Sequence, residues 1–339
     1  MNTILVTGGA GYIGSHTCKA LAKAGYLPVT YDNLSRGNYE AVKWGPLEIG
    51  ELADQAKLRE VIARHRPAAV VHFAALAYVG ESNENPALYY GNNVGGTAAL
   101  LEVMREADIG HIVFSSTCAI YGTPTTVPIS EECAEAPINP YGASKMVCER
   151  MLRECAKAFP LTFMALRYFN AAGADPDGEI GECHVPETHA IPLLLDAAAG
   201  VNDGFTIFGD DYPTPDGTCV RDYIHVTDLA AAHVAALRAL TSGAASAALN
   251  LGTGRGWSVR ELIDSMRRIT NRDVTVHVGP RRPGDPPVLV ADATRAHQKL
   301  GWQPQHSDLE TVVSDAWAWR QGRGKSWART MDANLGRMR

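Results

Sequence analysis

The sequence contains no paired-cysteine motif, no long hydrophobic run and no excess of positive charge. Its seven cysteines, at positions 18, 118, 133, 148, 155, 183 and 219, form no Cys-x-x-Cys pair, which predicts free thiols rather than a disulfide framework. Its 11 histidines show no metal-binding pattern. Cys183-His184 and His189 come nearest, but no second cluster completes a tetrahedral set, so we expect no metal.

Two further absences narrow the range of partners. No apolar stretch is long enough to cross a bilayer, and no basic segment followed by a cleavable apolar stretch opens the chain, so we expect a soluble cytoplasmic protein. The net charge of −6 argues against nucleic acid as the main partner, because phosphate-backbone binding needs a basic surface. Any anion-binding site must therefore be local.

Short β-branched runs alternate with helical patterns in the first ~115 residues, which is typical of a parallel α/β sheet with crossover helices. We expect strands at 4–7, 27–31, 69–73, 112–116 and 161–167, and helices at 14–24, 87–107 and 141–159. Beyond Asn170 the loops become rich in Gly, Pro and Asp, which predicts a smaller second domain at 171–339 after a first domain at 1–170. The segment 220–242 is expected to return to the first domain.

A glycine-rich segment, Thr7-Gly8-Gly9-Ala10-Gly11-Tyr12-Ile13-Gly14, follows the first predicted strand and opens a helix. In that context glycines allow pyrophosphate to approach the helix N-terminus, where backbone N–H groups favour anions. Asp32 ends the second predicted strand, 18 residues after Gly14, where a carboxylate can accept both ribose hydroxyls. The pattern predicts bound NAD rather than NADP, although Arg36 nearby leaves the 2′-phosphate form open.

The chemistry is predicted by Tyr141 and Lys145, one helical turn apart in Tyr-Gly-Ala-Ser-Lys. An ammonium at this distance favours the phenolate and makes Tyr141 a usable base near neutral pH. Thr117 ends a predicted strand at the edge where open α/β sheets bind ligands, and its hydroxyl can hold a substrate oxygen. On a dinucleotide-binding fold, these three residues favour redox chemistry at an alcohol carbon.

With Thr-Gly-x-x-Gly-x-x-Gly and Tyr-x-x-x-Lys, the chain resembles the extended short-chain dehydrogenase/reductase family, and within it the branch that epimerises UDP-sugars at C4. Further matching segments lie at 79–82, 89–94, 166–170, 220–226 and 281–285. The resemblance implies a Rossmann-type doubly wound parallel sheet with a smaller mixed α/β substrate domain, tightly bound NAD, and a homodimer formed through the helices near 87–107 and 141–159. It implies interconversion of UDP-galactose and UDP-glucose through a 4-keto sugar.

The resemblance also assigns contacts residue by residue. It implies cofactor contacts at Gly8, Gly11, Tyr12, Ile13, Gly14, Asp32, Asn33, Glu51, Leu52, Phe73, Ala74, Ala75, Asn92, Tyr141, Lys145 and Phe169. It implies UDP-sugar contacts at Thr117, Asn170, His189, Arg221, Tyr223, Arg282, Asp285 and Leu289. Arginines can clamp diphosphate oxygens bidentately, although a surface ion pair of Arg221 with Asp222 is the alternative.

Related dehydratases place an Asp-Glu pair directly after the active-site Thr, whereas Cys118 and Ala119 follow Thr117 here. The simplest complete reaction is therefore oxidation and re-reduction at one carbon. Leu289 stands where a Tyr restricts related enzymes to UDP-glucose, so UDP-N-acetylhexosamines become candidate substrates, with core packing as the alternative role. Ala77 stands where a cofactor-binding lysine is frequent, which predicts weaker retention of NAD.

Two other functions remain open from the sequence. One is an NAD-dependent oxidoreductase or epimerase of another nucleotide sugar, since one fold hosts different chemistries. The other is a non-catalytic NAD-binding regulator, for which a damaged Tyr-x-x-x-Lys motif would be typical. The motif is intact.

Overall fold

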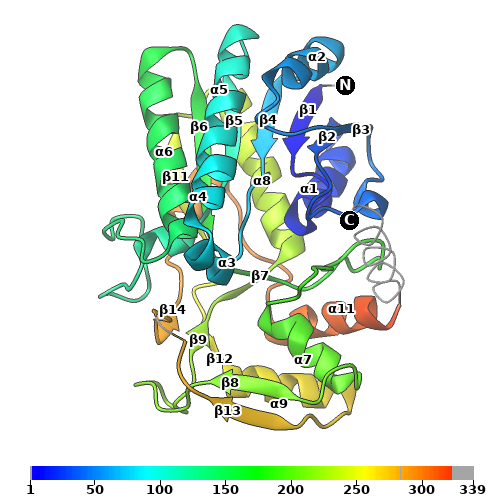
Figure 1. Ribbon diagram of the computed structural model, residues 1–339, viewed down its shortest axis with the longest axis vertical. Helices are drawn as coiled ribbons and strands as arrows, with labels where there is room; N and C mark the ends of the chain where they lie inside the picture. Colours follow the sequence, from blue (N-terminus) through cyan, green and yellow to red (C-terminus); the bar gives the residue numbers. More distant parts are fainter. Residues whose placement is uncertain (1, 283, 323–339) are drawn as a thin grey trace.

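The computed structural model describes residues 2–282 and 284–322, so the end of the predicted second domain, 323–339, lies outside the described residues. A seven-stranded parallel sheet with strand order β11-β6-β5-β4-β1-β2-β3 forms its larger part (Figure 1). Its strands are β1 (Thr3–Thr7), β2 (Leu27–Asp32), β3 (Leu47–Ile49), β4 (Ala69–His72), β5 (His111–Thr117), β6 (Thr162–Tyr168) and β11 (Ala247–Leu251). The order reverses beside β1, which opens a crevice at the carboxyl ends of the strands. The predicted doubly wound sheet is confirmed.

Helices cover both faces of this sheet. One core joins the sheet to α1 (Tyr12–Lys23) and α8 (Val226–Thr241), and a second core joins it to α2 (Gln55–His65), α5 (Gly96–Glu106) and α6 (Pro140–Ala158). Within the described residues, no helix combines the length and the apolar character that spanning a bilayer requires.

The helix expected at 87–107 is interrupted. The structure has α4 (Pro86–Tyr89), a π-helical segment at Tyr90–Gly95, and then α5. Inside the π-helical segment, the Asn93 side chain donates to the backbone oxygen of Leu76 (3.0 Å) and to Ser144 Oγ (3.0 Å). Two glycines in the six residues of this segment weaken the regular helix, and the side chain of Asn93 is fixed by hydrogen bonds to residues outside it.

The sequence analysis also missed β3, α2 and β11. β3 has only three residues and is half-buried, so it carries too little alternation to be recognised. The sequence does carry a signal for the start of α2, namely the capping residue Asp54, whose side chain accepts a hydrogen bond from the N–H of Lys57 (3.0 Å).

The smaller part of the molecule lies below the large sheet in Figure 1 and has its own core. It contains α7 (Ala190–Ala198), α9 (Val259–Thr270), α11 (Leu309–Gln321) and the parallel pair β8 (Phe205–Phe208) and β13 (Val276–Gly279). β7 (Asn170–Ala172) pairs with β10 (Tyr223–His225), and β9 (Val220–Arg221) lies between β12 (Trp257–Ser258) and β14 (Val288–Leu289). The remaining helices are α3 (Val79–Glu84) and α10 (Thr294–Leu300).

The chain returns to the large sheet later than the predicted segment 220–242. Residues 220–225 form β9 and β10, which pair outside the large sheet because their partners are β7, β12 and β14. α8 lies against the large sheet, and β11 then joins it beside β6. The returning segment therefore starts at Val226 and includes Leu251.

Candidate active site

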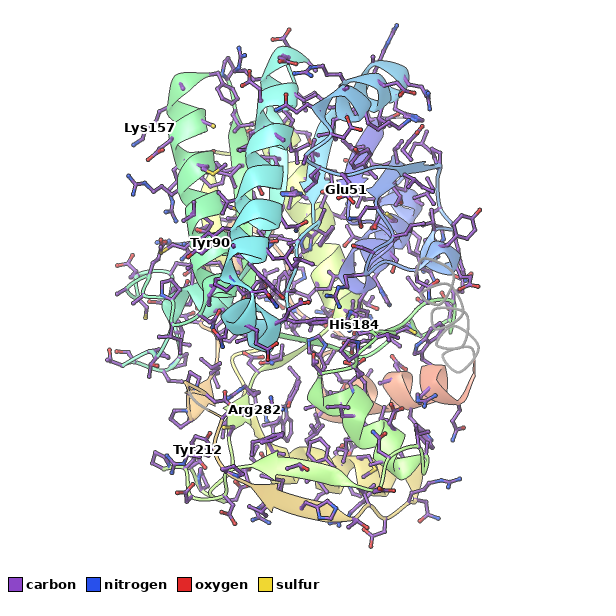
Figure 2. All side chains as sticks on the ribbon, in the orientation of Figure 1. Glu51, Tyr90, Lys157, His184, Tyr212 and Arg282 are labelled. Carbon is purple, nitrogen blue, oxygen red and sulfur yellow. The ribbon has the colours of Figure 1, made fainter. Side chains whose placement is uncertain are left out.

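A cleft of about 1430 Å³ runs from the carboxyl ends of the large sheet down to β8 and β14. Every residue predicted to contact the cofactor or the UDP-sugar lines this cleft except Lys145, which is buried behind it. Figure 2 shows Glu51 at the level of the sheet, His184 near the middle of the molecule and Arg282 in the smaller part. The structure therefore brings together residues from nearly the whole described sequence.

The cofactor end is built on the turn between β1 and α1. Gly8 has a positive φ of 72°, and a Cβ on Gly14 would lie 2.2 Å from the Gly8 carbonyl oxygen. Gly11 is the N-cap of α1 and makes no side-chain cap, so the first backbone N–H groups remain available to an anion. This open turn fits the pyrophosphate of a dinucleotide.

Asp32 lies at the end of β2, and its side chain is held in place by the backbone. Its two carboxylate oxygens accept from the N–H groups of Ala10 (3.0 Å) and Leu34 (2.9 Å). Burial raises the pKa of this carboxyl, which these hydrogen bonds partly counter. Arg36 donates to Glu81 (2.6 Å), so its charge is engaged by a carboxylate, which favours NAD over a 2′-phosphate.

The catalytic end brings β5 and α6 together. Thr117 is the last residue of β5, and Tyr141 lies in the first turn of α6, which Asn139 caps by accepting from the Gly142 N–H (2.8 Å). Both side chains line the cleft although little of them is exposed. A substrate alcohol placed between them meets two hydroxyl groups.

The electrostatics of this pair differ from the sequence prediction. Burial raises the pKa of the Tyr141 phenol well above its ordinary value, and the hydrogen bond with Thr117 acts in the opposite direction. Burial also lowers the pKa of Lys145 to about 8, and its Nζ donates to the Ser115 carbonyl oxygen (2.8 Å). In the protein without its cofactor, the loss of hydration therefore opposes the expected shift of Tyr141 towards a phenolate.

The sequence analysis missed a tyrosine beside this pair. Tyr168, the last residue of β6, stands opposite Thr117 in the sheet register and shares a 2.6 Å hydrogen bond with Ser115 Oγ. It lines the cleft. The predicted strand 161–167 ended one residue before it, so extending that strand would have revealed it. Close by, the buried Asn170 Oδ1 has no hydrogen-bond partner and is available to a ligand.

The part of the cleft predicted to hold the nucleotide of the substrate is formed by β9, β10 and the loop before β14. Arg221 and Asp285 form an ion pair with each other at the cleft wall. The surface ion pair of Arg221 with Asp222 is wrong, because Asp222 is fully buried and accepts from the N–H groups of Thr253 (2.9 Å) and Ala291 (3.1 Å).

Arg282 stacks its guanidinium over the ring of Phe208, 4.0 Å from the centroid. Phe208 lines the cleft and remains partly exposed, and no sequence motif pointed to it. A flat aromatic or guanidinium surface here suits a planar base.

Two predicted substrate contacts have protein partners of their own. Leu289 in β14 lines the cleft and also packs against the buried cluster that contains Phe169 and Cys118, so both of its predicted roles remain compatible with the structure. His189 is the N-cap of α7, and its Nδ1 pairs with Glu182.

Comparisons with known proteins agree with this geometry. Residues 4–252 match the model of the NAD dependent epimerase/dehydratase family. The UDP-glucose 4-epimerase of Rhizobium meliloti (strain 1021) is 55% identical over 324 residues, which are 96% of this chain and 98% of that protein. The crystal structure of UDP-glucose 4-epimerase from Brucella ovis in complex with NAD superposes with a TM-score of 0.92 at 55% identity, covering 94% of this chain and 98% of that one. The UDP-Glc/GlcNAc 4-epimerase from Campylobacter jejuni reaches a TM-score of 0.83 at 40% identity, covering 95% and 99%.

Proposed function

The chain belongs to the NAD dependent epimerase/dehydratase family, and on this premise we propose that it interconverts UDP-galactose and UDP-glucose by inverting the sugar at C4. The observation that carries the proposal is the meeting of Thr117 and Tyr141 in a cleft that continues from a dinucleotide cradle to the Arg221 region. The two residues directly after Thr117 are Cys118 and Ala119, neither of which is a carboxylate. The acid and the base that elimination of water would need are therefore missing at these two positions.

The cofactor is NAD, held at the turn before α1 and at Asp32. When bound, this cofactor would supply a reversible hydride acceptor for C4 of the sugar. Tyr141 exchanges the proton of the sugar 4-hydroxyl, and Thr117 holds the oxygen. Burial lowers the pKa of Lys145 only to about 8, so its ammonium is still mostly charged at neutral pH and can stabilise the phenolate once it forms.

Inversion at C4 requires the sugar to turn over while the nucleotide stays fixed. Arg221 and Arg282 come from separate segments of the smaller part and offer bidentate donors for the diphosphate. Asp285, now paired with Arg221, offers oxygens to the ribose hydroxyls. These anchors hold the nucleotide, so the sugar makes few contacts with the protein and is free to turn over.

UDP-N-acetylhexosamines form a second substrate class. Leu289 is shorter than the Tyr that restricts related enzymes, and it lies at the cleft wall. The Campylobacter jejuni protein, described as acting on UDP-Glc and GlcNAc, has a similar fold.

We also propose that residues 1–170 hold NAD and that 171–339 hold the UDP-sugar, with α8 and β11 returning to the large sheet. The side chains of Leu88 and Tyr90 are exposed, 51% and 41% accessible, which supports a homodimer through α4, the π-helical segment at Tyr90–Gly95, α5 and α6. Light scattering after size exclusion tests this, and the mass of a single chain contradicts it. The seven cysteines, all among the described residues, form no disulfide there, which supports a reducing, cytoplasmic setting.

The experiment is to incubate the purified protein, without added NAD, with UDP-galactose and separately with UDP-N-acetylgalactosamine, and to follow the sugar by NMR. The 4-epimer is expected from UDP-galactose. No epimer from either substrate, even after NAD is supplied, contradicts the proposal. Net formation of NADH at 340 nm supports the alternative oxidoreductase, and binding of NAD without any turnover supports the regulator.

A further inference from the structure

We propose that Glu182, His184, Glu187 and His189 form a binding site for a divalent transition-metal ion of the zinc class. They follow the pattern Glu-x-His-x-x-Glu-x-His in the loop before α7. Each offers one ligand atom, and these four atoms all lie within 4.8 Å of one another. Two imidazoles and two carboxylates are a donor set that Zn²⁺ accepts in tetrahedral geometry.

The side chains converge on a common point. His184 Nδ1 lies 3.1 Å from Glu182 Oε1 and 3.8 Å from Glu187 Oε2. His189 Nδ1 approaches the same Glu182 oxygen and lies 4.0 Å from Glu187 Oε1. Glu187 is itself oriented, because its Oε1 accepts from the backbone N–H groups of Thr188 (2.7 Å) and His189 (2.9 Å).

One of these nitrogens makes no hydrogen bond with the protein. His184 Nδ1 is buried, and although it is close to Glu182, the geometry makes no hydrogen bond. A buried ring nitrogen that is left without a hydrogen bond and faces two carboxylates is better satisfied by an ion between them.

A second acidic cluster in the same molecule provides a contrast. Asp175, Asp177 and Glu179 also converge, but the Lys19 ammonium lies 2.7 Å from a carboxylate oxygen of each. That cluster already has its cation. Glu182 and Glu187 instead form ion pairs with the two histidines, whose imidazole nitrogens are themselves metal ligands in the neutral form.

The position of the site gives it a consequence. The His184 ring packs edge-on against Tyr12 (centroids 6.2 Å apart), which begins α1, and against Tyr78 (6.0 Å). His189 begins α7 in the smaller part. An ion here would hold the loop 182–189 in one conformation at the cleft, where the His184 ring packs against Tyr12 and Tyr78.

This assignment changes two sequence expectations. The sequence analysis expected no metal because it considered Cys183 with the histidines, and it left out the carboxylates on either side. It also gave His189 to the UDP-sugar, whereas the structure directs its Nδ1 to Glu182.

The test is a Zn²⁺ titration of the full-length, metal-stripped protein against a chromophoric chelator, with Glu182→Gln and His189→Gln as variants. One ion per chain is expected, with at least about tenfold weaker binding in each variant. Asp177→Asn, in the lysine-filled cluster, is the matched control and should bind as the unaltered protein does. Circular dichroism checks that every variant is folded.

Co²⁺ provides a second readout that identifies the ligands. Visible d–d bands of a four-coordinate N/O site are expected in the unaltered protein and in Cys183→Ser, and they should disappear in His189→Gln. The proposal is overturned if no stoichiometric binding occurs, if the Glu182 and His189 variants bind as the unaltered protein does, or if binding is lost in Cys183→Ser.

Discussion

A buried charge pair behind the catalytic helix provides the sharpest stability prediction. Glu149 in α6 and Arg167 in β6 are 0% and 1% exposed. Glu149 Oε1 accepts from Arg167 Nε (2.8 Å) and from Ser116 Oγ (2.6 Å), beside Thr117. Glu149→Gln keeps the shape and removes the charge, so the buried Arg167 guanidinium keeps Glu135 as its carboxylate partner and the Tyr121 hydroxyl (2.9 Å) as a neutral one. The exchange also removes the ion pair of Glu149 with Arg153 (2.7 Å). Breaking a buried ion pair lowers the free energy of unfolding by about 3–5 kcal/mol. Because Arg167 keeps one carboxylate partner, we expect a loss of about 3 kcal/mol in this variant.

The assay is urea unfolding followed by circular dichroism, with the midpoint compared at an unchanged slope. Glu154→Gln is the matched control on the same helix, because its pair with Arg150 is exposed and should contribute less than about 1 kcal/mol. Adding Arg167→Met to Glu149→Gln removes the unpaired charge and should recover stability. If Glu149→Gln and Glu154→Gln unfold at the same urea concentration, the reasoning is refuted.

Three further predictions concern other parts of the molecule. Gly14→Ala places a Cβ 2.2 Å from the Gly8 carbonyl oxygen, so we expect the free energy of unfolding to fall by about 1–3 kcal/mol and the co-purified NAD to be lost. Gly95→Ala, whose Cβ would meet nothing within 4 Å, should keep both its stability and its NAD. Equal NAD content in the two variants contradicts the assignment of the turn before α1 to the cofactor. Burial lowers the pKa of His72 to about 3, and its two ring nitrogens hydrogen-bond with threonine hydroxyls. Because the unfolded chain takes up this proton near pH ~6.5, the stability present above that pH should be lost as the pH falls towards 3. His72→Gln should therefore make the unfolding midpoint depend less steeply on pH. Leu289→Tyr should reduce kcat/KM for UDP-N-acetylgalactosamine more than for UDP-galactose; an equal change in both assigns Leu289 to packing alone.

The sequence predicts most of the large sheet because its signals are local. Strands such as β5 carry a short apolar run, at 112–114, and the helix that begins at Pro140 carries its own cap in Asn139. Local sequence signals do not predict an element whose conformation or position depends on contacts with residues far away in the sequence. The π-helical segment depends on bonds from Asn93 to Leu76 and Ser144, and β11 reaches its place beside β6 only after a long crossover.

The same distinction holds for the candidate site. Motif spacing was sufficient to predict Tyr141, Lys145 and Thr117 as neighbours of one cleft. The direction of the Tyr141 pKa was not predictable, because it depends on burial by the whole surrounding fold. Tyr168 was missed for a related reason, since its approach to Ser115 follows from strand register.

The most direct test of a temporary oxidation at C4 uses UDP-galactose with deuterium at that carbon. The product is analysed by mass spectrometry and NMR, with Tyr141→Phe measured in parallel. The account predicts UDP-glucose that keeps the deuterium at C4, and a large loss of turnover in the variant without loss of bound NAD. Deuterium lost to solvent, or full activity in Tyr141→Phe, would contradict it.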